Sequence, residues 1–553
     1  MNYKKYQKMY HPIPLEDRQC PNNEITHAPI WCSVDLRDGN QALYSPMTTE
    51  EKIEFFKFLV KLGFKEIEVG FPAASHTEFE FVRRLIDENL IPDDVTIQVL
   101  TQAREHIIKK TVEALKGAKN AIIHLYNSTS TLQREVVFRK SKEEIKQLAV
   151  DGAKLVMSLV DGQLDGNIRF EYSPESFTCT EPDYAAEVTN AVLDVFKPSE
   201  TNKVIVNLPS TIEVATANVY ADQIEYMCKH LNNREHLVIS VHAHNDRGTG
   251  VASSELALLA GADRVEGTIF GNGERTGNTD VITVALNMFC QGIDPELHLE
   301  NIDEIIEVYE KYNRLPINPR HPYAGEMAYV AFSGSHQDAI KKSMDKFGSS
   351  PSNKWANPYL TIDPTDIGRK YEPILINSQS GKGGVSYIME NKYGYTLPKP
   401  MLAEFSSLIT DMSDEKKTVL TNHEIHQAFK DTYVNVAEPI KTRFYRSTEE
   451  DDCTILSATI EKDGKVTSIE GKGNGPLDAL CNGLRQFLGQ QFEICNYTEH
   501  ALTRSSNSRA ATYIEINDHN HHKTYWGAGV DANINTASIY ALISAVNRML
   551  ADN

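Results

Sequence analysis

The chain has 553 residues, 41% hydrophobic and 24% charged, with a formal net charge of −20 at pH 7. This length predicts two or more globular domains, because one core rarely organises so long a chain. The acidic balance argues against a nucleic acid or an anionic membrane as partner, since both require a basic face. No apolar run approaches the roughly 18 residues of a membrane-spanning helix, and the polar N-terminus is not typical of a signal peptide.

The eight cysteines are scattered, without a C-x-x-C pair or other close spacing. This distribution favours neither a thiolate zinc site nor a disulfide framework, so we expect a reducing, cytoplasmic setting.

Residues 1–29 are polar and are expected to form an N-terminal extension. From Trp31 onward, short apolar runs alternate with helix-like segments such as TTEEKIEFFKFLVKLG, in which a capping Thr, an acidic first turn and a final Gly delimit an amphipathic body. The strand candidates are WCSVDL, KEIEVGF, VTIQVLT, NAIIHLY, NIRFEY, KVIVNL, LVISVHAH and RVEGTIF.

Eight β-α units predict an α/β fold, a (β/α)8 TIM barrel, over residues 30–325. An open doubly wound sheet shows the same alternation, but no G-x-G-x-x-G follows the first strand. Residues 326–440 are expected to form small α-rich linker subdomains, and residues 441–553 an α+β C-terminal domain. In the C-terminal domain, strands, a Gly-rich turn and a helix occur twice, which indicates an internal duplication.

Two histidines, His242 and His244, stand two apart at the end of the seventh strand candidate. Residues i and i+2 of a strand point to the same side, so both imidazoles can reach one point beyond it. Neutral imidazole is a common ligand of divalent metals. An isolated pair could equally be two partly buried histidines that neighbouring groups satisfy.

Further polar residues follow other strand candidates, and the carboxyl ends of the strands are where active sites form in such barrels. They are Arg37, Asp38, His124, Ser173, Glu175, Thr211 and Asn278. A carboxylate, two imidazoles and an amide suit Mg²⁺ or Mn²⁺ and do not exclude Zn²⁺. Arg37 could donate to a developing oxyanion.

Each of these residues also has a plain structural interpretation. Asp38 could cap the turn that Gly39 continues, Arg37 could form a surface salt bridge, and Asn278 or Glu175 could merely hold a turn. Their common position at one end of one barrel favours the metal site.

The motifs LRDGNQAL, EVGFPAAS, HLYNSTS, EYSPESF, NLPSTIE, HAHNDRGTG and GNGERTGN resemble those of the metal-dependent acyl-CoA-condensing barrel enzymes. Together with SGSHQDAIKKSM, SQSGKGGVSYIM and the duplicated tail, they resemble the long-form 2-isopropylmalate synthases within that group. Asn40 departs from the Glu of many shorter members, but it is not a presumed ligand.

The resemblance implies an acyltransferase that condenses acetyl-CoA with 2-oxoisovalerate, hydrolyses the thioester and so enters leucine biosynthesis. Asp38, His242, His244 and Asn278 would be the metal ligands, Arg37 would lie beside the ketone oxygen, and His124, Ser173, Glu175 and Thr211 would line the oxo-acid site. His336 and Tyr359 would complete the active site of the partner subunit, which implies a homodimer.

Three roles rest on further hypotheses. His336 is the candidate general base and Glu175 the alternative, while Leu43, Tyr44 and Tyr126 are expected to form an apolar wall for the branched side chain. In the tail, the resemblance implies that leucine binds as an inhibitor. The Gly-rich turns with Gly471, Gly473, Gly475, Gly527 and Gly529 are its candidate site, although they could simply connect strand to helix.

Three rival functions remain open. A citramalate or homocitrate synthase would use another oxo acid, and a metal-dependent lyase would run the reverse cleavage. A non-catalytic leucine sensor would lack activity, which the complete set of candidate ligands disfavours.

Overall fold

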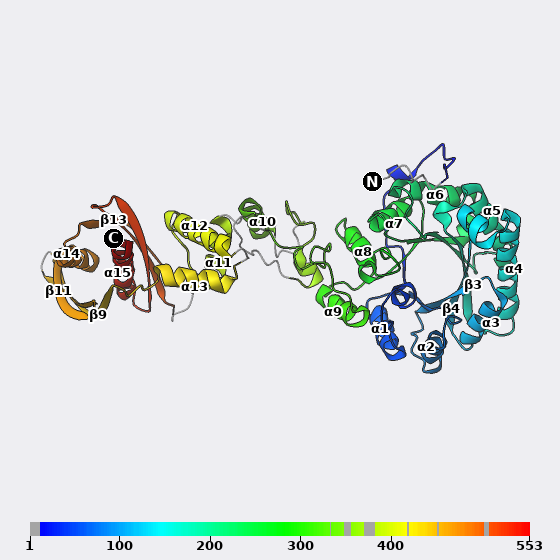
Figure 1. Cartoon of the computed structure of the whole chain (residues 1–553), viewed down its shortest axis with the longest axis horizontal. Helices are drawn as coiled ribbons and strands as arrows, with labels where there is room; N and C mark the ends of the chain where they lie inside the picture. Colours follow the sequence, from blue (N-terminus) through cyan, green and yellow to red (C-terminus); the bar gives the residue numbers. More distant parts are fainter. Residues whose placement is uncertain are drawn as a thin grey trace. The chain divides into compact units, whose positions relative to one another are not determined.

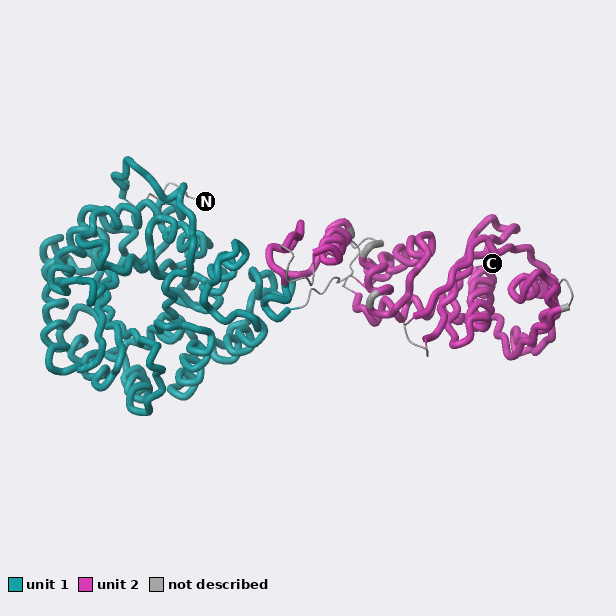
Figure 2. The backbone as a smooth tube through the Cα atoms, turned by 180° about the vertical axis from the view of Figure 1, so that it is seen from behind, with its two compact units in different colours: residues 1–328, 364–369 teal, residues 329–363, 370–553 magenta. Residues whose placement is uncertain are grey.

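The computed structural model describes residues 11–331, 333–347, 355–369, 382–416, 420–450, 453–502 and 508–552. The chain forms two compact units, residues 1–328 with 364–369 and residues 329–363 with 370–553, which Figure 2 colours teal and magenta. Residues 378–381 of the SQSGKGGVSYIM motif lie outside the described residues. Within the described parts of the chain, no helix has the length and apolarity needed to cross a membrane.

The first unit contains a closed barrel of parallel strands in the order β1 to β8, with helices around it (Figure 1). The predicted TIM barrel is therefore confirmed. The strands are β1 (Ile30–Ser33), β2 (Glu66–Gly70), β3 (Thr96–Gln102), β4 (Asn120–Ser128), β5 (Asn167–Glu175), β6 (Val204–Ser210), β7 (Leu237–Ala243) and β8 (Arg264–Gly267). The helices are α1 (Thr49–Lys61), α2 (His76–Asp87), α3 (Glu105–Ala114), α4 (Lys142–Val160), α5 (Pro182–Phe196), α6 (Ala217–His230), α7 (Gly250–Leu259), α8 (Val281–Phe289) and α9 (Ile302–Asn313).

Local signals in the sequence set the bounds of the barrel helices. Thr48 and Glu51 form a reciprocal capping box at the start of α1. Beyond its end, Gly63 adopts a φ of +101°, a conformation that favours glycine. Every residue of β2, β6 and β7 is buried, because helices cover the outside of a parallel barrel and side chains fill its inside.

The first strand is shorter than predicted. β1 ends at Ser33, and Asp35–Gly39 form a π-helical turn, η3, instead of continuing the strand through Leu36. The buried Asp35 carboxylate accepts hydrogen bonds from the Ser33 hydroxyl at 2.8 Å and from the Ile269 amide at 3.1 Å. These contacts hold the chain in the turn, and such turns are frequent at functional sites.

The second unit consists of helices followed by two small antiparallel sheets. The helices are α10 (Gly334–Phe347), α11 (Lys382–Tyr393), α12 (Lys399–Lys416), α13 (Asn422–Tyr433), α14 (Pro476–Leu488) and α15 (Ile534–Asp552). The strands are β9 (Ile440–Glu450), β10 (Cys453–Lys462), β11 (Lys465–Gly473), β12 (Phe492–Ala501), β13 (Ala510–Asp518) and β14 (Lys523–Asp531).

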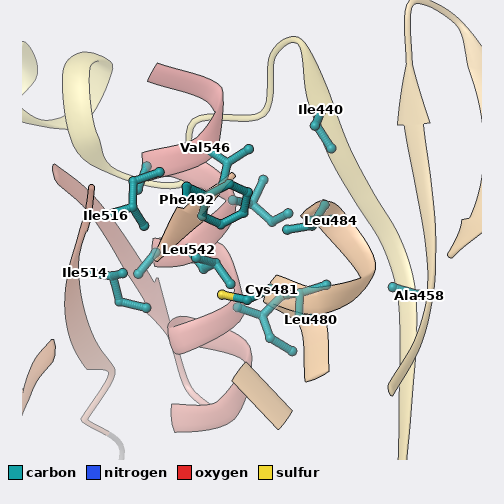
Figure 3. Packing of buried hydrophobic residues seen from close by; sticks show 14 of the residues in the cluster. Ile440, Ala458, Leu480, Cys481, Leu484, Phe492, Ile514, Ile516, Leu542 and Val546 are labelled. Atoms are coloured by element: carbon teal, nitrogen blue, oxygen red, sulfur yellow. The ribbon is translucent and has the colours of Figure 1, made fainter. Parts of the chain in front are cut away.

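The predicted duplication is confirmed, because each sheet of three strands is followed by one helix. The two repeats share an apolar core that includes Leu480 and Leu484 of the first repeat and Ile514 and Leu542 of the second (Figure 3). The opposite face of the second sheet packs on α11, α12 and α13, where Tyr513 and Trp526 join a second apolar cluster.

The glycines predicted to form turns in the tail lie mostly inside strands. Gly471 and Gly473 belong to β11, Gly527 and Gly529 belong to β14, and Gly475 is the N-cap of α14. A Cβ atom on Gly529 would lie 1.8 Å from the Ala537 carbonyl oxygen of α15, and Gly471, Gly473 and Gly527 face comparable backbone contacts. These four glycines therefore allow a helix to pack directly on its own sheet.

Candidate active site

A cavity of about 380 Å³ opens at the carboxyl ends of the barrel strands, and we call it the basin. The polar residues along its lining are Arg37, Asp38, Gln41, His124, Ser173, Glu175, Asn207, Thr211, His242, His244, Glu274 and Arg275. Its apolar lining is formed by Phe71, Leu100, Tyr126 and Pro209. Nearly every barrel residue predicted for the site thus contributes to one cavity.

The η3 turn and β7 bring three candidate metal ligands together. Asp38, His242 and His244 are all buried, and one potential ligand atom of each lies within 4.8 Å of the others. Nε2 of His242 is 3.8 Å from Oδ2 of Asp38. The alternation along a strand thus places both imidazoles on the side where the first turn delivers a carboxylate.

Hydrogen bonds from the other ring nitrogens orient both imidazoles. Nδ1 of His242 lies 2.8 Å from Oε2 of Glu266, and Nδ1 of His244 lies 3.2 Å from the Gly277 carbonyl oxygen. Both partners are acceptors, so each Nδ1 carries the proton and each Nε2 keeps its lone pair. This is the orientation that metal-binding histidines require.

Asn278 has the geometry of a fourth ligand. Its Nδ2 donates to Oδ2 of Asp38 at 2.5 Å and to the Asn272 carbonyl oxygen at 3.1 Å. Its Oδ1 is buried and has no hydrogen-bond partner among the described residues. A buried acceptor without a donor is costly, so this oxygen fits a cation, and the donor set of oxygen and imidazole nitrogen fits a divalent one.

The charge states of Asp38 and His244 suit a cation as well. Burial favours the neutral form of Asp38, but Arg37 and the two imidazoles outweigh it and hold the pKa of Asp38 below its ordinary value. Burial, followed by the neighbouring His242, lowers the pKa of His244 to about 4. An ionised carboxylate and a neutral imidazole are the forms that bind metals.

Arg37 lies beside the candidate ligands, where its guanidinium donates to Oδ1 of Asp38 at 2.8 Å and to Oε2 of Glu68 at 2.5 Å. Burial opposes its charge, but Glu68 and then Asp38 raise the pKa of Arg37. A permanent cation is therefore fixed at the edge of the basin, next to the proposed ion.

The predicted oxo-acid residues lie along the same wall. Nε2 of His124 is 2.7 Å from Oγ of Ser173, and Glu175 accepts a hydrogen bond from the Ser128 hydroxyl. Oγ1 of Thr211 accepts from the Ser176 amide at 2.9 Å. These side chains interleave with apolar lining residues, since His124 and Tyr126 both belong to β4.

Other predicted residues have different positions. His336 and Tyr359 belong to the second unit, where their rings stack with centroids 4.0 Å apart. The prediction that Leu43 and Tyr44 line the basin is wrong, because Leu43 is buried elsewhere and Tyr44 is fully exposed. Of the predicted wall, Tyr126 alone lies in the lining.

Sequence reasoning missed a set of polar side chains beneath the basin. They are Glu66, Glu68, Gln98, Glu171, Arg264 and Glu266, each 5% exposed or less. They alternate with apolar residues in strands buried on both faces, as in KEIEVGF and RVEGTIF. A charged residue at every second position of a buried strand could have indicated polar groups inside the barrel.

Comparisons with known proteins agree with this architecture. A family described as HMGL-like matches residues 28–308, one described as Alpha-isopropylmalate synthase, post-catalytic domain-like, matches residues 326–390, and the LeuA allosteric (dimerisation) domain matches residues 419–550. The 2-isopropylmalate synthase of Acetoanaerobium sticklandii is 52% identical over 554 residues, which cover 100% of this chain and 97% of the relative. That of Clostridium acetobutylicum is 54% identical over 557 residues, covering 99% of each chain.

A parallel barrel with candidate metal ligands at the carboxyl ends of its strands places the chain among the HMGL-like barrel enzymes. Within them, identity over the whole length shows that the chain belongs to the 2-isopropylmalate synthase family, a family of acyl-transferring enzymes.

Proposed function

We propose that the basin is where this chain condenses acetyl-CoA with 2-oxoisovalerate and hydrolyses the thioester to 2-isopropylmalate and CoA. The observation that carries the proposal is the convergence of Asp38, His242, His244 and the unpaired Oδ1 of Asn278. These four groups would hold Mg²⁺ or Mn²⁺, with Zn²⁺ not excluded by the donor types. Bound there, the ion would act as a Lewis acid toward the ketone of the oxo acid.

The protein's own residues would then bind and orient the substrate. Arg37 would donate to the oxygen on which negative charge develops, and it is held ready by Glu68 and Asp38. His124 and Ser173 offer hydrogen-bonding groups to the carboxylate side of the oxo acid. Leu100 and Pro209 would contact its branched side chain, a contact worth about 1–3 kcal/mol per methylene.

The acetyl methyl group must lose a proton to an enzyme base. We retain His336 as the proposed base, because a neutral imidazole can accept a proton, and Glu175 as the alternative, because it lines the basin. His336→Ala should lower kcat more than it raises the KM for the oxo acid. An unchanged kcat in this variant, combined with a collapse of kcat in Glu175→Gln, would assign the role to Glu175.

One assay tests the activity itself. The full chain is assayed for release of the CoA thiol with 2-oxoisovalerate, pyruvate and 2-oxoglutarate, with and without a chelator. We expect the highest kcat/KM with 2-oxoisovalerate, loss of turnover on chelation, and no turnover in Asp38→Ala, while the exposed control Asp165→Ala keeps full activity. Preference for pyruvate or 2-oxoglutarate would indicate a citramalate or homocitrate synthase, and chelator-resistant turnover would refute the metal site.

The second unit supports two further proposals. Its match to the LeuA allosteric (dimerisation) domain supports a homodimer that leucine inhibits. Four of the five glycines first proposed as the leucine site contact their own helices, so the ligand would bind elsewhere on the repeats. Removal of residues 441–553 should abolish inhibition, and inhibition that persisted would refute this assignment.

A further inference from the structure

The barrel interior holds a layer of buried polar groups, of which only His124 and, through Arg37, Glu68 have a part in the proposed reaction. We call Glu68, Gln98, His124, Glu171, Arg264 and Glu266 the buried polar layer; each is 3% exposed or less. An ionised group in a protein interior is tolerated only when it is paired and hydrogen-bonded. The contacts within the layer therefore show which of its charged members are paired and which of them connects to the candidate metal ligands.

Glu266 connects this layer to the candidate metal ligands. Its Oε2 accepts from Nδ1 of His242 at 2.8 Å and from Nδ2 of Asn207 at 3.2 Å. Its Oε1 accepts from Arg264 at 2.7 Å and from Gln98 at 3.2 Å. All four partners are donors, so the carboxylate has one orientation and must be ionised in it.

Three members of the layer, His124, Glu171 and Glu266, could by their spacing hold a metal ion of their own. The guanidinium of Arg264 already lies 2.7 Å from Glu266 and 3.5 Å from Glu171. It also donates to Ser240 at 2.8 Å and to Gln98 at 2.6 Å, so its position is fixed. A second cation between these carboxylates would be repelled by the positive charge of Arg264. The layer is therefore not a second metal site but a structural support for the residues of the basin.

We propose that Glu266, held by Arg264, is a positioning residue that keeps the proton of His242 on Nδ1 and thereby presents Nε2 to a divalent ion. This inference rests on the metal site of the proposed function. The carboxylate can only accept a hydrogen bond from His242, and Arg264 fixes where it accepts. Such outer partners of metal-binding histidines commonly change metal affinity by about 10–100-fold when they are replaced.

The variant Glu266→Gln reverses this hydrogen bond at nearly constant volume. An amide has one acceptor and one donor end, and the guanidinium of Arg264 can only donate. The amide oxygen must therefore face Arg264, and the amide nitrogen must donate to Nδ1 of His242. The proton of the neutral imidazole then moves to Nε2, the nitrogen that would bind the ion.

The experiment measures Mn²⁺ binding to the metal-depleted full chain by electron paramagnetic resonance, without substrate. We expect Glu266→Gln to raise the Kd for Mn²⁺ by at least about 10-fold. Glu266→Asp keeps the charge and both acceptor oxygens, so its Kd should lie closer to that of the wild type. This second variant also keeps the test open if the amide variant does not fold.

Glu171→Gln is the matched control, because Glu171 lies in the same layer without contacting a candidate ligand. Burial, and then the nearby Glu266, raise the pKa of Glu171 well above its ordinary value, so the site favours the uncharged form that the amide mimics. Its Kd for Mn²⁺ should stay within about threefold of the wild type, well below the 10–100-fold effect expected at Glu266.

An unchanged Kd in folded Glu266→Gln would overturn the positioning role and leave the metal site in place. An equal rise of the Kd for Mn²⁺ in Glu171→Gln would also overturn the positioning role, because the ion would then be bound by the group of His124, Glu171 and Glu266. The metal site itself is tested by Asp38→Ala: Mn²⁺ binding as tight as in the wild type would refute the proposed function together with this inference.

Discussion

The interior of the barrel and the interior between the two tail repeats are built in opposite ways. In the barrel, Arg264 and Glu266 lie fully buried at the centre and are held by an ion pair and by hydrogen bonds. Between the repeats, the core consists of apolar side chains, among them Leu480 and Leu542 (Figure 3). The buried groups of the barrel hold the candidate site residues in position, whereas the buried groups of the tail hold its sheets and helices together by apolar packing.

The two interiors differ in what they contribute to stability. A buried ion pair often gains little over an apolar pair of the same shape, because desolvation offsets the attraction. Apolar burial stabilises by about 25 cal/mol per Å², provided that the surfaces meet closely. We therefore expect the barrel to be sensitive to loss of one charge, and the tail to be sensitive to added volume where a helix meets a sheet.

The largest effect is expected for added volume in the tail. In Gly529→Val the new Cβ would lie 1.8 Å from the Ala537 carbonyl oxygen, which is backbone and cannot move aside. If α15 cannot pack on its sheet, the shared core is opened to water. We therefore expect the free energy of unfolding of the second unit to fall by more than about 5 kcal/mol. Calorimetry of the full chain should show its transition missing while that of the barrel remains.

The matched control for this substitution is Gly475→Ala. Gly475 has extended backbone and nothing within 4 Å of an added Cβ, so the cost should be about 1 kcal/mol or less, that of a changed N-cap. A wild-type transition in Gly529→Val would mean that the helix does not rest on the sheet as the glycines indicate.

The next largest effect is expected for loss of one charge in the barrel. Arg264→Met keeps most of the side-chain volume but leaves Glu66 and Glu266 without their buried cation. Removing one partner of a buried pair costs about 3–5 kcal/mol. Calorimetry should show a lowered barrel transition, whereas Lys109→Met, which breaks the exposed pair with Glu105, should change it by less than about 1 kcal/mol.

A wild-type barrel transition in Arg264→Met would contradict the view that the layer depends on one cation. A double variant with Glu266→Gln provides the sharper comparison. If the two groups act as a pair, the combined loss should be smaller than the sum of the single losses.

The sequence predicted the parts of the barrel that depend on short-range pattern. Eight apolar strands with intervening amphipathic helices predicted the closed fold, and the spacing of His242 and His244 predicted that they face one point. It did not predict the η3 turn, because Asp35 holds that turn through the Ile269 amide, more than two hundred residues away in the chain. Glu266 was missed for a similar reason, since its partners come from different strands.

Asp35 gives the barrel unit a pH dependence of its own. Burial is the largest cause that raises the pKa of Asp35, to about 7, from an unfolded value near 4. The folded state therefore binds a proton that the unfolded state has lost, and this contribution to stability disappears as pH rises from about 4 through about 7. It amounts to at most about 4 kcal/mol for three units of pKa.

Asp35→Asn should remove this dependence, because the amide oxygen can still accept from the Ile269 amide and carries no charge. The barrel transition of the variant should rise relative to the wild type as pH increases from 5 to 8, while the tail transition should move equally in both proteins. A constant difference across that range would show that Asp35 stays ionised in the folded barrel.

The smallest effect is expected for the ion itself. A ligand that binds only the folded state at 100 times its Kd stabilises by about 2.7 kcal/mol. Mn²⁺ at that excess should raise the barrel transition by a few degrees and leave the tail transition unchanged, because the candidate ligands Asp38, His242 and His244 all belong to the first unit. In Asp38→Ala the shift should vanish, since two imidazoles and one amide lack the charge that compensates the ion's dehydration. An equal rise of both transitions would instead indicate that the ion binds generally to this acidic chain, whose formal net charge is −20, and the contrast between a barrel interior that positions metal ligands and a tail interior of packed apolar side chains would lose its support.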